Sequence, residues 1–157
     1  MIRTKIAVAG VLGRMGQNII ESAQLNDGVE IVGIFDKSPI SQDLLVSLKL
    51  KSDIAVTIDD AFDRADVVID FTSPSALFMF TESAIAHKAG LVVGTTGLEQ
   101  KHFNLLQQTS KATKIFYAPN MSLGVNSFFQ VARDTAAKLK DYDIEIIESH
   151  HKFKKDA

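Results

Sequence analysis

Five short runs of apolar residues recur along the chain. They are rich in Val, Ile and Phe, and they read "KIAVAG" at 5–10, "EIVGIFD" at 30–36, "ADVVIDFT" at 65–72, "LVVGTT" at 91–96 and "KIFYAP" at 114–119. Nearly every position in each run is apolar, which is typical of strands that are buried on both faces. Because sheets covered on both faces are usually parallel, the pattern predicts an α/β fold.

The segments between these runs have the spacing of helices. Apolar residues recur at helical intervals over residues 15–23, and Asn-Asp-Gly at residues 26–28 supplies a stop. A second helix is predicted after Ser73, which can cap it, with Pro74 in its first turn and Gly90 after its end, and a third over about residues 98–108. Alternation of strands and helices predicts a right-handed, doubly wound parallel sheet with a ligand at the carboxyl ends of its strands.

The pattern changes after about residue 120. Residues 126–140 predict a helix that carries apolar side chains at helical spacing, and residues 142–149 ("YDIEIIES") predict a strand that follows it. That strand alternates between apolar and polar positions, which indicates an antiparallel sheet with one solvent-facing side. We therefore expect a first domain over residues 1–122 and the beginning of an α+β domain, one helix and one strand, over residues 123–157.

A glycine-rich turn follows the first predicted strand. Gly10, Gly13 and Gly16 in "GVLGRMG" open the first predicted helix, where backbone N–H groups and the helix dipole favour a phosphate. The third position of the usual motif is glycine, whereas here it is Leu12. Asp36 lies 20 residues beyond Gly16, at the end of the second strand, where a carboxylate can accept hydrogen bonds from a ribose. The sequence therefore predicts a Rossmann-type dinucleotide-binding domain, with a purely structural tight turn as the alternative.

Two cations beside this turn bear on the choice of dinucleotide. Asp36 favours the free 2′-hydroxyl of NAD, and the adjacent Lys37 favours the 2′-phosphate of NADP. Arg14 and Lys37 can equally be solvated surface charges. The sequence leaves the choice between NADH and NADPH open.

Composition narrows the class of protein. The chain has 157 residues with a net charge of −2, and this balance argues against a nucleic-acid-binding surface. It contains no cysteine, which excludes disulfides and thiolate nucleophiles. No apolar run has the length of a membrane span or the form of a signal peptide, so we expect a soluble, cytoplasmic protein that does not bind a membrane.

Four segments together resemble one enzyme family. They are the glycine turn, "GTTG" at 94–97, "APNMSLGVN" at 118–126 and "IEIIESHHKFKKDA" at 144–157, and in this order they resemble dihydrodipicolinate reductase, also called 4-hydroxy-tetrahydrodipicolinate reductase. The resemblance covers essentially the whole chain. It implies NADH- or NADPH-dependent reduction of 4-hydroxy-tetrahydrodipicolinate to tetrahydrodipicolinate, in diaminopimelate and lysine biosynthesis.

The resemblance also assigns site residues. It implies that His150 and Lys154 are catalytic, with Lys154 as proton donor, and that His151 contacts the substrate. The residues implied to bind the cofactor are Gly10, Val11, Leu12, Gly13, Arg14, Met15, Gly16, Asp36, Lys37, Phe71, Thr72, Gly94, Thr95, Thr96, Ala118, Pro119, Asn120 and Met121. No metal site is recognisable.

The chemistry of the last residues agrees with these roles. Hydride transfer to an electrophilic carbon leaves negative charge on its partner nitrogen, so a proton donor and nearby cations stabilise the transition state. The Lys and His residues over 150–155 are suitable, and they could attract a substrate that carries two carboxylates. Without the resemblance, paired histidines and terminal lysines would be interpreted as solvated side chains. His87 and His102 are predicted to be surface or packing residues.

One departure from the family is large. Its members continue beyond "D-A" with "P-S-G-T", which holds a substrate carboxylate, and with a domain that carries homo-tetramer contacts, whereas Ala157 is the last residue here. We therefore expect an inactive or weakly active N-terminal fragment whose last strand can self-associate. The alternatives are a non-catalytic NAD(P)-binding module or remnant, and a different Rossmann dehydrogenase.

Overall fold

The computed structural model describes residues 2–147 and Ser149. The chain divides between Tyr117 and Ala118 into two compact units, Met1–Tyr117 and Ala118–Ala157, and each is described by itself. The predicted domain boundary after residue 122 remains a prediction. Within the described residues, no helix has both the length and the apolar character needed to cross a bilayer.

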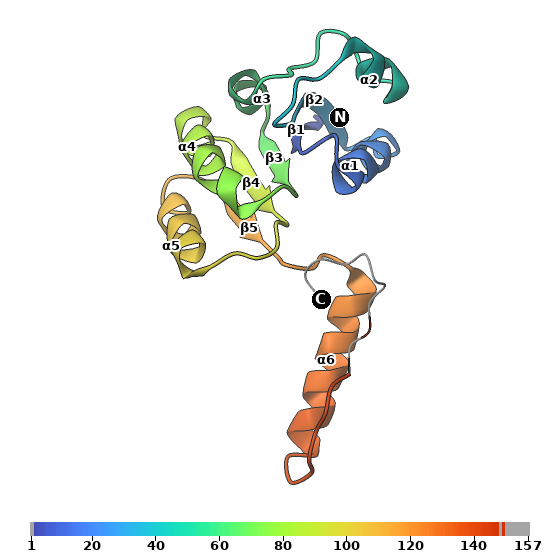
Figure 1. Ribbon diagram of the computed structural model, residues 1–157, viewed down its shortest axis with the longest axis vertical. Coiled ribbons are helices and arrows are strands. Elements are labelled where there is room, and N and C mark those ends of the chain that lie inside the picture. Colours follow the sequence, from blue (N-terminus) through green and yellow to red (C-terminus); the bar gives the residue numbers. More distant parts are fainter. Residues whose placement is uncertain (1, 148, 150–157) are drawn as a thin grey trace. The chain divides into compact units, whose positions relative to one another are not determined.

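The first unit alternates strands and helices (Figure 1). In chain order its elements are β1 (Thr4–Ala9), α1 (Arg14–Gln24), β2 (Val29–Phe35), α2 (Gln42–Ser47), α3 (Ile58–Arg64), β3 (Val67–Asp70), the 3₁₀ turn η1 (Pro74–Ala76), α4 (Leu77–His87), β4 (Gly90–Val93), α5 (Gln100–Thr109) and β5 (Ile115–Tyr117). All five predicted strands and the three predicted helices of this unit are confirmed.

The five strands form one parallel sheet in the order β2-β1-β3-β4-β5. Beside β2, Ala55 forms an isolated parallel bridge with Gly33. With this bridge counted as a strand, the spatial order becomes 3-2-1-4-5-6, the order of dinucleotide-binding Rossmann folds. Successive strands are added on one side of β1 up to the bridge at Ala55 and on the other side from β3 onward. The strand order therefore reverses between β1 and β3, and the carboxyl ends of these two strands border the crevice in which such folds bind ligands.

Helices cover both faces of the sheet, as the largely apolar strands predicted. On one face, Val8 and Ile34 of the strands pack with Ile20 of α1 and Leu45 of α2. On the other face, a larger core joins the strands to α3, α4 and α5, and Phe62 is its largest fully buried side chain. Burial of these apolar side chains is the main favourable contribution to folding.

Two short helices, α2 and α3, were not predicted. Each has only six or seven residues, too few for an apolar period to be visible. Their starts nevertheless carry a signal in the sequence. The Ser41 side chain accepts a hydrogen bond from Leu44 N, and the Thr57 side chain accepts one from Asp60 N, so both helices begin at ordinary N-caps.

The second unit contains α6 (Leu123–Lys138), which begins three residues before its predicted start. Polar side chains of "NMSLGVN" fix this beginning. Asn120 Oδ1 accepts from Ser122 N at 2.8 Å, Ser122 Oγ accepts from Val125 N at 3.4 Å, and Asn126 Nδ2 donates to Asn120 O at 3.0 Å. The motif thus caps a helix, whatever other contacts it makes.

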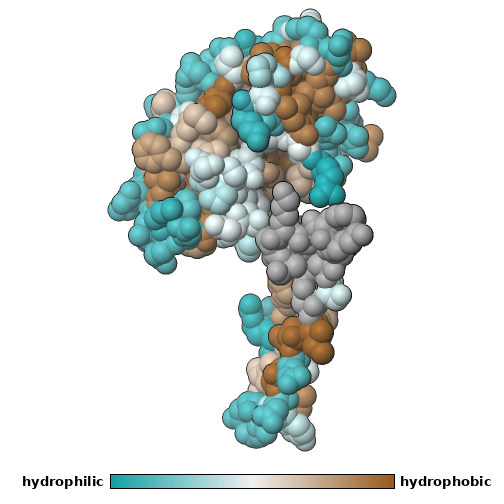
Figure 2. Space-filling view, viewed as in Figure 1, coloured by the Kyte–Doolittle hydropathy of each residue, from teal (hydrophilic) through white to brown (hydrophobic). Residues whose placement is uncertain are grey.

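No residue of α6 is buried, and its apolar side chains are visible on the surface in Figure 2. The predicted strand over residues 142–149 is wrong for its described part, because residues 143–147 and Ser149 have no strand structure. A strand is stable only when its backbone groups pair with a neighbour, and the sheet ladders of the described residues all belong to the first unit. The alternating pattern therefore has no sheet to join here.

His87, predicted to be a surface or packing residue, links α4 to α3. Its Nε2 lies 2.9 Å from Asp59 Oδ1, and its Nδ1 lies 3.4 Å from Asp63 Oδ1. The side chain is 19% exposed, whereas both aspartates are largely solvated. The hydrogen bond to Asp59, supported by the charges of both carboxylates, raises the pKa of His87 above its ordinary value.

This contact predicts a pH dependence of stability. Because the pKa of His87 is raised by folding, its stabilising contribution is complete below the unfolded pKa and is lost as pH rises through the folded pKa. Urea unfolding of the wild type and of His87→Gln from pH 5 to 8.5 should show the wild-type advantage shrinking with pH. The trend should vanish when Asp59→Asn and Asp63→Asn are both present. A wild-type advantage that is constant or grows with pH would contradict this assignment.

Candidate functional site

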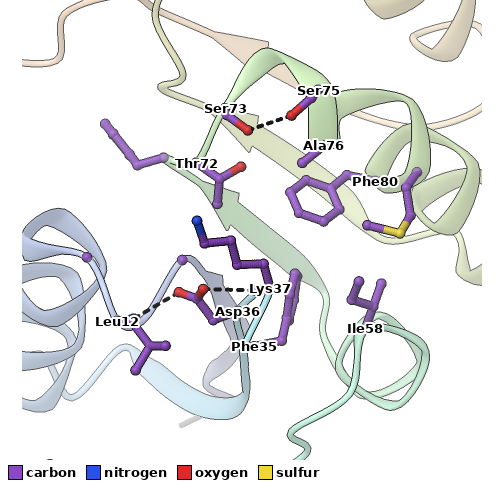
Figure 3. Close-up of a pocket in the computed structure, with 14 residues that line it drawn as sticks. Leu12, Phe35, Asp36, Lys37, Ile58, Thr72, Ser73, Ser75, Ala76 and Phe80 are labelled. Atoms are coloured by element: carbon purple, nitrogen blue, oxygen red, sulfur yellow. Dashed lines mark hydrogen bonds between the residues drawn. The ribbon is translucent and has the colours of Figure 1, made fainter. Parts of the chain in front are cut away.

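A pocket of about 640 Å³ lies at the carboxyl ends of β1, β2 and β3. It opens at the point where the strand order reverses, and Figure 3 shows the side chains that surround it. Its lining residues are Gly10, Leu12, Gly13, Phe35, Asp36, Lys37, Ile58, Phe71, Thr72, Ser73, Ser75, Ala76, Met79 and Phe80. The pocket thus combines the predicted glycine turn with the predicted acidic residue at the end of β2.

The glycine turn packs too closely for side chains at two of its positions. Gly10 has a φ of +76°, and a Cβ there would lie 2.8 Å from Thr72 Cγ2. A Cβ on Gly16 would lie 2.3 Å from the carbonyl oxygen of Gly10, so the start of α1 rests directly on the turn. Glycine at these positions lets the backbone approach both α1 and any group inside the pocket.

Free backbone donors lie at the start of α1. Gly13 is the N-cap and provides no side-chain acceptor, and the first turn contains no acidic residue. The first backbone bond into this turn runs from Gln17 N to Gly13 O, which leaves the amides of Arg14, Met15 and Gly16 without an acceptor among the described residues. Three free N–H groups and the positive end of an eleven-residue helix form a site for an anion such as a phosphate.

Asp36 points toward the glycine turn. Its Oδ2 accepts a hydrogen bond from Leu12 N at 3.0 Å, and its Oδ1 accepts one from Lys37 N at 2.8 Å. A carboxylate has about four acceptor positions, so further donors can still bind to it. The Lys37 side chain extends into the space between the turn and Thr72 (Figure 3). One anion and one cation therefore stand at the same end of the pocket.

The opposite side of the pocket is apolar, and the sequence did not reveal it. Phe35, Ile58, Met79 and Phe80 line it, and the rings of Phe35 and Phe80 meet edge to face at 5.4 Å (Figure 3). Ile58 belongs to the unpredicted helix α3. This surface suits a flat apolar group, which would gain burial and aromatic contacts there. Ser73 and Ser75 add hydroxyl groups at its rim.

The segments after β3 and β4 meet at close range. A Cβ on Gly94 would lie 2.2 Å from the Phe71 ring, so the ring rests directly on the backbone of "GTTG". Thr72 is held by Asp70, whose Oδ1 accepts from both the Thr72 amide and its hydroxyl. The predicted residues Phe71, Thr72 and Gly94 are therefore brought together, and Phe71 and Thr72 line the pocket.

Asp70 was missed by the sequence interpretation. It is fully buried at the end of β3, and burial raises its pKa, an effect that its hydrogen bonds with Thr72 partly oppose. A buried titratable group beside a pocket is a frequent feature of functional sites. The available signal was an aspartate directly after the apolar residues Val67, Val68 and Ile69.

The other described residues predicted to bind the cofactor are not among those that line the pocket. Val11 is buried in the core, and its amide donates to Phe35 O at 3.4 Å. Arg14 and Met15 are exposed at the start of α1, Thr95 is buried and Thr96 is exposed. Ala118, Pro119, Asn120 and Met121 belong to the second unit. His150, His151 and Lys154 lie outside the described residues.

Sheet order, glycine turn and pocket define a Rossmann-type α/β domain of the class that binds nucleotides. The family described as "Dihydrodipicolinate reductase, N-terminus" matches residues 4–121, and "Dihydrodipicolinate reductase, C-terminus" matches residues 124–157. The chain belongs to the dihydrodipicolinate reductase family.

Individual relatives agree with this assignment. The 4-hydroxy-tetrahydrodipicolinate reductase of Sulfurimonas denitrificans is 38% identical over 157 residues, and the match covers 98% of this chain and 58% of that protein. A dipicolinate-bound dihydrodipicolinate reductase from Paenisporosarcina sp. TG-14 has a TM-score of 0.67 and 25% identity, over 87% of this chain and 54% of that one. GenD2, solved in complex with NAD, shares the fold, with a TM-score of 0.60 and 19% identity over 76% of this chain and 35% of that one. The chain spans somewhat more than half the length of the curated reductases it matches.

Proposed function

We propose that this chain binds NADH or NADPH and forms the cofactor-binding part of a 4-hydroxy-tetrahydrodipicolinate reductase of lysine biosynthesis. The observation that carries the proposal is that free amides at the start of α1 directly follow Leu12 and Gly13, which line one pocket with Asp36. Family membership supports the choice of reaction.

The pocket fits a dinucleotide group by group. The amides of Arg14, Met15 and Gly16 would hold the pyrophosphate, because they are free at the start of α1 and the close packing of Gly16 on the Gly10 carbonyl fixes that start against the turn. Asp36 would accept hydrogen bonds from the adenosine ribose. The apolar side formed by Ile58, Phe80 and their neighbours would receive the adenine ring.

The nicotinamide would lie toward the segments after β3 and β4. In the proposal Phe71 and Thr72 border it, together with residues 94–96 and 118–121, which the resemblance to the family assigns to it. A bound reduced dinucleotide supplies the hydride that reduces the substrate. The side chains of this chain orient the ring and exclude water, and they provide the proton that balances the transfer.

The substrate roles rest on the family alone. We propose Lys154 as the donor of a proton to the substrate nitrogen, His150 as its acid or base partner and His151 as a substrate contact. The Paenisporosarcina relative was solved with dipicolinate, a planar dicarboxylate, so cations near the substrate position are chemically reasonable. Because the chain spans only 58% of a curated relative, we propose that this polypeptide binds dinucleotide more effectively than it turns over substrate.

Fluorescence titration of the 157-residue chain with NADH and with NADPH tests the proposal. Saturable binding of at least one is expected, and a coupled assay that generates the family's substrate should show weak turnover or none. Binding of neither dinucleotide would overturn the proposal. Full turnover would confirm the reaction and would overturn the expectation of low activity. The same result would exclude a non-catalytic NAD(P)-binding module.

Lys37 offers a test of dinucleotide preference. Its side chain enters the pocket next to Asp36, so Lys37→Ala removes the cation that faces a 2′-phosphate. We expect the dissociation constant of NADPH to rise by about 5- to 20-fold, because a charge-assisted hydrogen bond contributes roughly 1.5 kcal/mol. NADH affinity should change by less than about twofold, within the effect expected of a side chain it does not contact. Equal weakening of both would show that Lys37 does not read the phosphate.

A further inference from the structure

Asp70 presents a buried carboxyl group that the proposed reaction does not use. Its side chain is 0% exposed, and strand alternation puts it on the same face as Val68, inside the larger core. One oxygen is well satisfied. Oδ1 accepts from Thr72 N at 2.8 Å and from Thr72 Oγ1 at 2.6 Å.

The second oxygen of Asp70 and the hydroxyl of Thr95 are both left without a partner. Among the described residues, Asp70 Oδ2 and Thr95 Oγ1 are the two buried side-chain atoms that form no hydrogen bond. The backbone brings them together, because Asp70 pairs with Val93 across the sheet and Gly94 N donates to Asp70 O at 2.8 Å. Thr95 lies close enough to lower the pKa of Asp70 slightly against the larger effect of burial, although the two oxygens stand outside hydrogen-bonding geometry.

An ionised carboxylate would be costly at this position. Burial without a cation strongly disfavours the charged form, and no charged side chain of the described residues contributes to the pKa of Asp70. Two arrangements would satisfy both atoms: the Thr95 hydroxyl can donate to Oδ2 of a carboxylate, or a protonated Oδ2 can donate to Thr95 Oγ1 while Oδ1 keeps its two bonds from Thr72. Because full burial without a cation disfavours the carboxylate, the second arrangement fits this position better.

The contacts of Asp70 extend to two parts of the proposed cofactor site. Through Thr72 it reaches the glycine turn, because the Thr72 methyl group occupies the space beside Gly10. Through Thr95 it reaches "GTTG", on whose Gly94 the Phe71 ring rests. Asp70 therefore stands between the segments that follow β1, β3 and β4.

We propose that Asp70 is a positioning residue that holds a proton toward Thr95 Oγ1 and thereby fixes Thr72 and the segment 94–96 in the arrangement that receives the nicotinamide end of the dinucleotide. The inference rests on the proposed function of the pocket. It assigns Asp70 no contact with the reacting atoms.

Isosteric variants separate the neutral acid from a carboxylate. In Asp70→Asn the amide oxygen can accept from Thr72 and the NH₂ group can donate to Thr95, as the protonated acid does. We expect its dissociation constant for NADH or NADPH to stay within about threefold of the wild type. Asp70→Leu removes both connections and should weaken binding about tenfold or more.

A matched control addresses simple loss of stability. Thr109 is also a buried threonine, but its hydroxyl donates to Leu105 O within α5, away from the pocket. Thr95→Val should weaken dinucleotide binding, whereas Thr109→Val should lower the unfolding temperature with little effect on binding. Equal binding losses in the two threonine variants would overturn the positioning role.

Carbon-13 NMR of the Asp70 carboxyl group reads the proton directly. We expect titration above the ordinary aspartate range, and a fall of wild-type unfolding free energy relative to Asp70→Asn as pH rises through that titration, because folding raises the pKa. Titration at or below the ordinary range, or an Asp70→Asn variant that binds as poorly as Asp70→Leu, would overturn the proposal. If the wild type binds no dinucleotide, the proposed function fails, and the carboxyl titration still decides whether Asp70 holds a proton.

Discussion

Gly16→Ala should abolish most dinucleotide binding by this chain. The new Cβ would lie 2.3 Å from the Gly10 carbonyl oxygen and 2.8 Å from the Cα of Val11, both backbone atoms that cannot rotate away. The start of α1 must therefore shift from the turn, which misplaces the free amides of residues 14–16. We expect the dissociation constant for NADH or NADPH to rise by at least about tenfold, and overpacking to lower stability by about 1–3 kcal/mol.

Gly90→Ala is the matched control for this variant. Gly90 is the first residue of β4, at the amino-terminal ends of the strands and away from the pocket. A Cβ there would meet its nearest atom at 3.4 Å, an ordinary contact. Fluorescence titration and thermal unfolding of both variants separate binding from stability. Unchanged dinucleotide affinity in a folded Gly16→Ala variant would show that the turn does not hold the ligand.

Asp36→Ala should cause the second large loss. It removes the group proposed to bind the ribose and also the acceptor that ties Leu12 N to the end of β2 at 3.0 Å. Hydrogen bonds to a charged group contribute about 1.5–3 kcal/mol each, so a rise of about 10- to 100-fold in the dissociation constant is expected. The loss should affect NADH at least as strongly as NADPH, because the carboxylate favours a free 2′-hydroxyl.

Asp66→Ala provides a close comparison. Asp66 also accepts a backbone hydrogen bond, in this case from Lys5 N of β1 at 2.8 Å, but it lies at the amino-terminal ends of the strands, away from the pocket. This variant should lose stability without losing dinucleotide affinity. If Asp66→Ala weakened binding as much as Asp36→Ala, loss of sheet order rather than loss of a ribose contact would explain both.

The sequence predicted the sheet because its strands are buried on both faces. Such strands need continuous apolar runs, and these are visible without knowledge of tertiary contacts. Helices α2 and α3 escaped prediction because they are short and depend on local caps at Ser41 and Thr57. The strand expected over residues 142–149 failed in its described part for the opposite reason, since its pattern is suitable but no neighbouring strand pairs with it.

The residues at the pocket likewise fall into those that local sequence spacing predicts and those that only tertiary packing reveals. Gly10, Gly16 and Asp36 could be named from the sequence because their spacing follows from one strand–turn–helix unit. Ile58 and Asp70 could not, because their place at the pocket depends on how separate helices and strands pack. The roles of His150 and Lys154 came from the family resemblance, and both residues lie outside the described part of the chain.

Amide NMR measures directly whether the turn between Gly10 and Gly16 binds a dinucleotide. Titrating the nitrogen-15-labelled chain with NADH or NADPH should shift the amide signals of residues 12–16 most strongly, together with those of Asp36 and Thr72, in one saturable process. Saturable binding that leaves the amides of residues 12–16 unchanged, or no binding of either dinucleotide, would contradict the account.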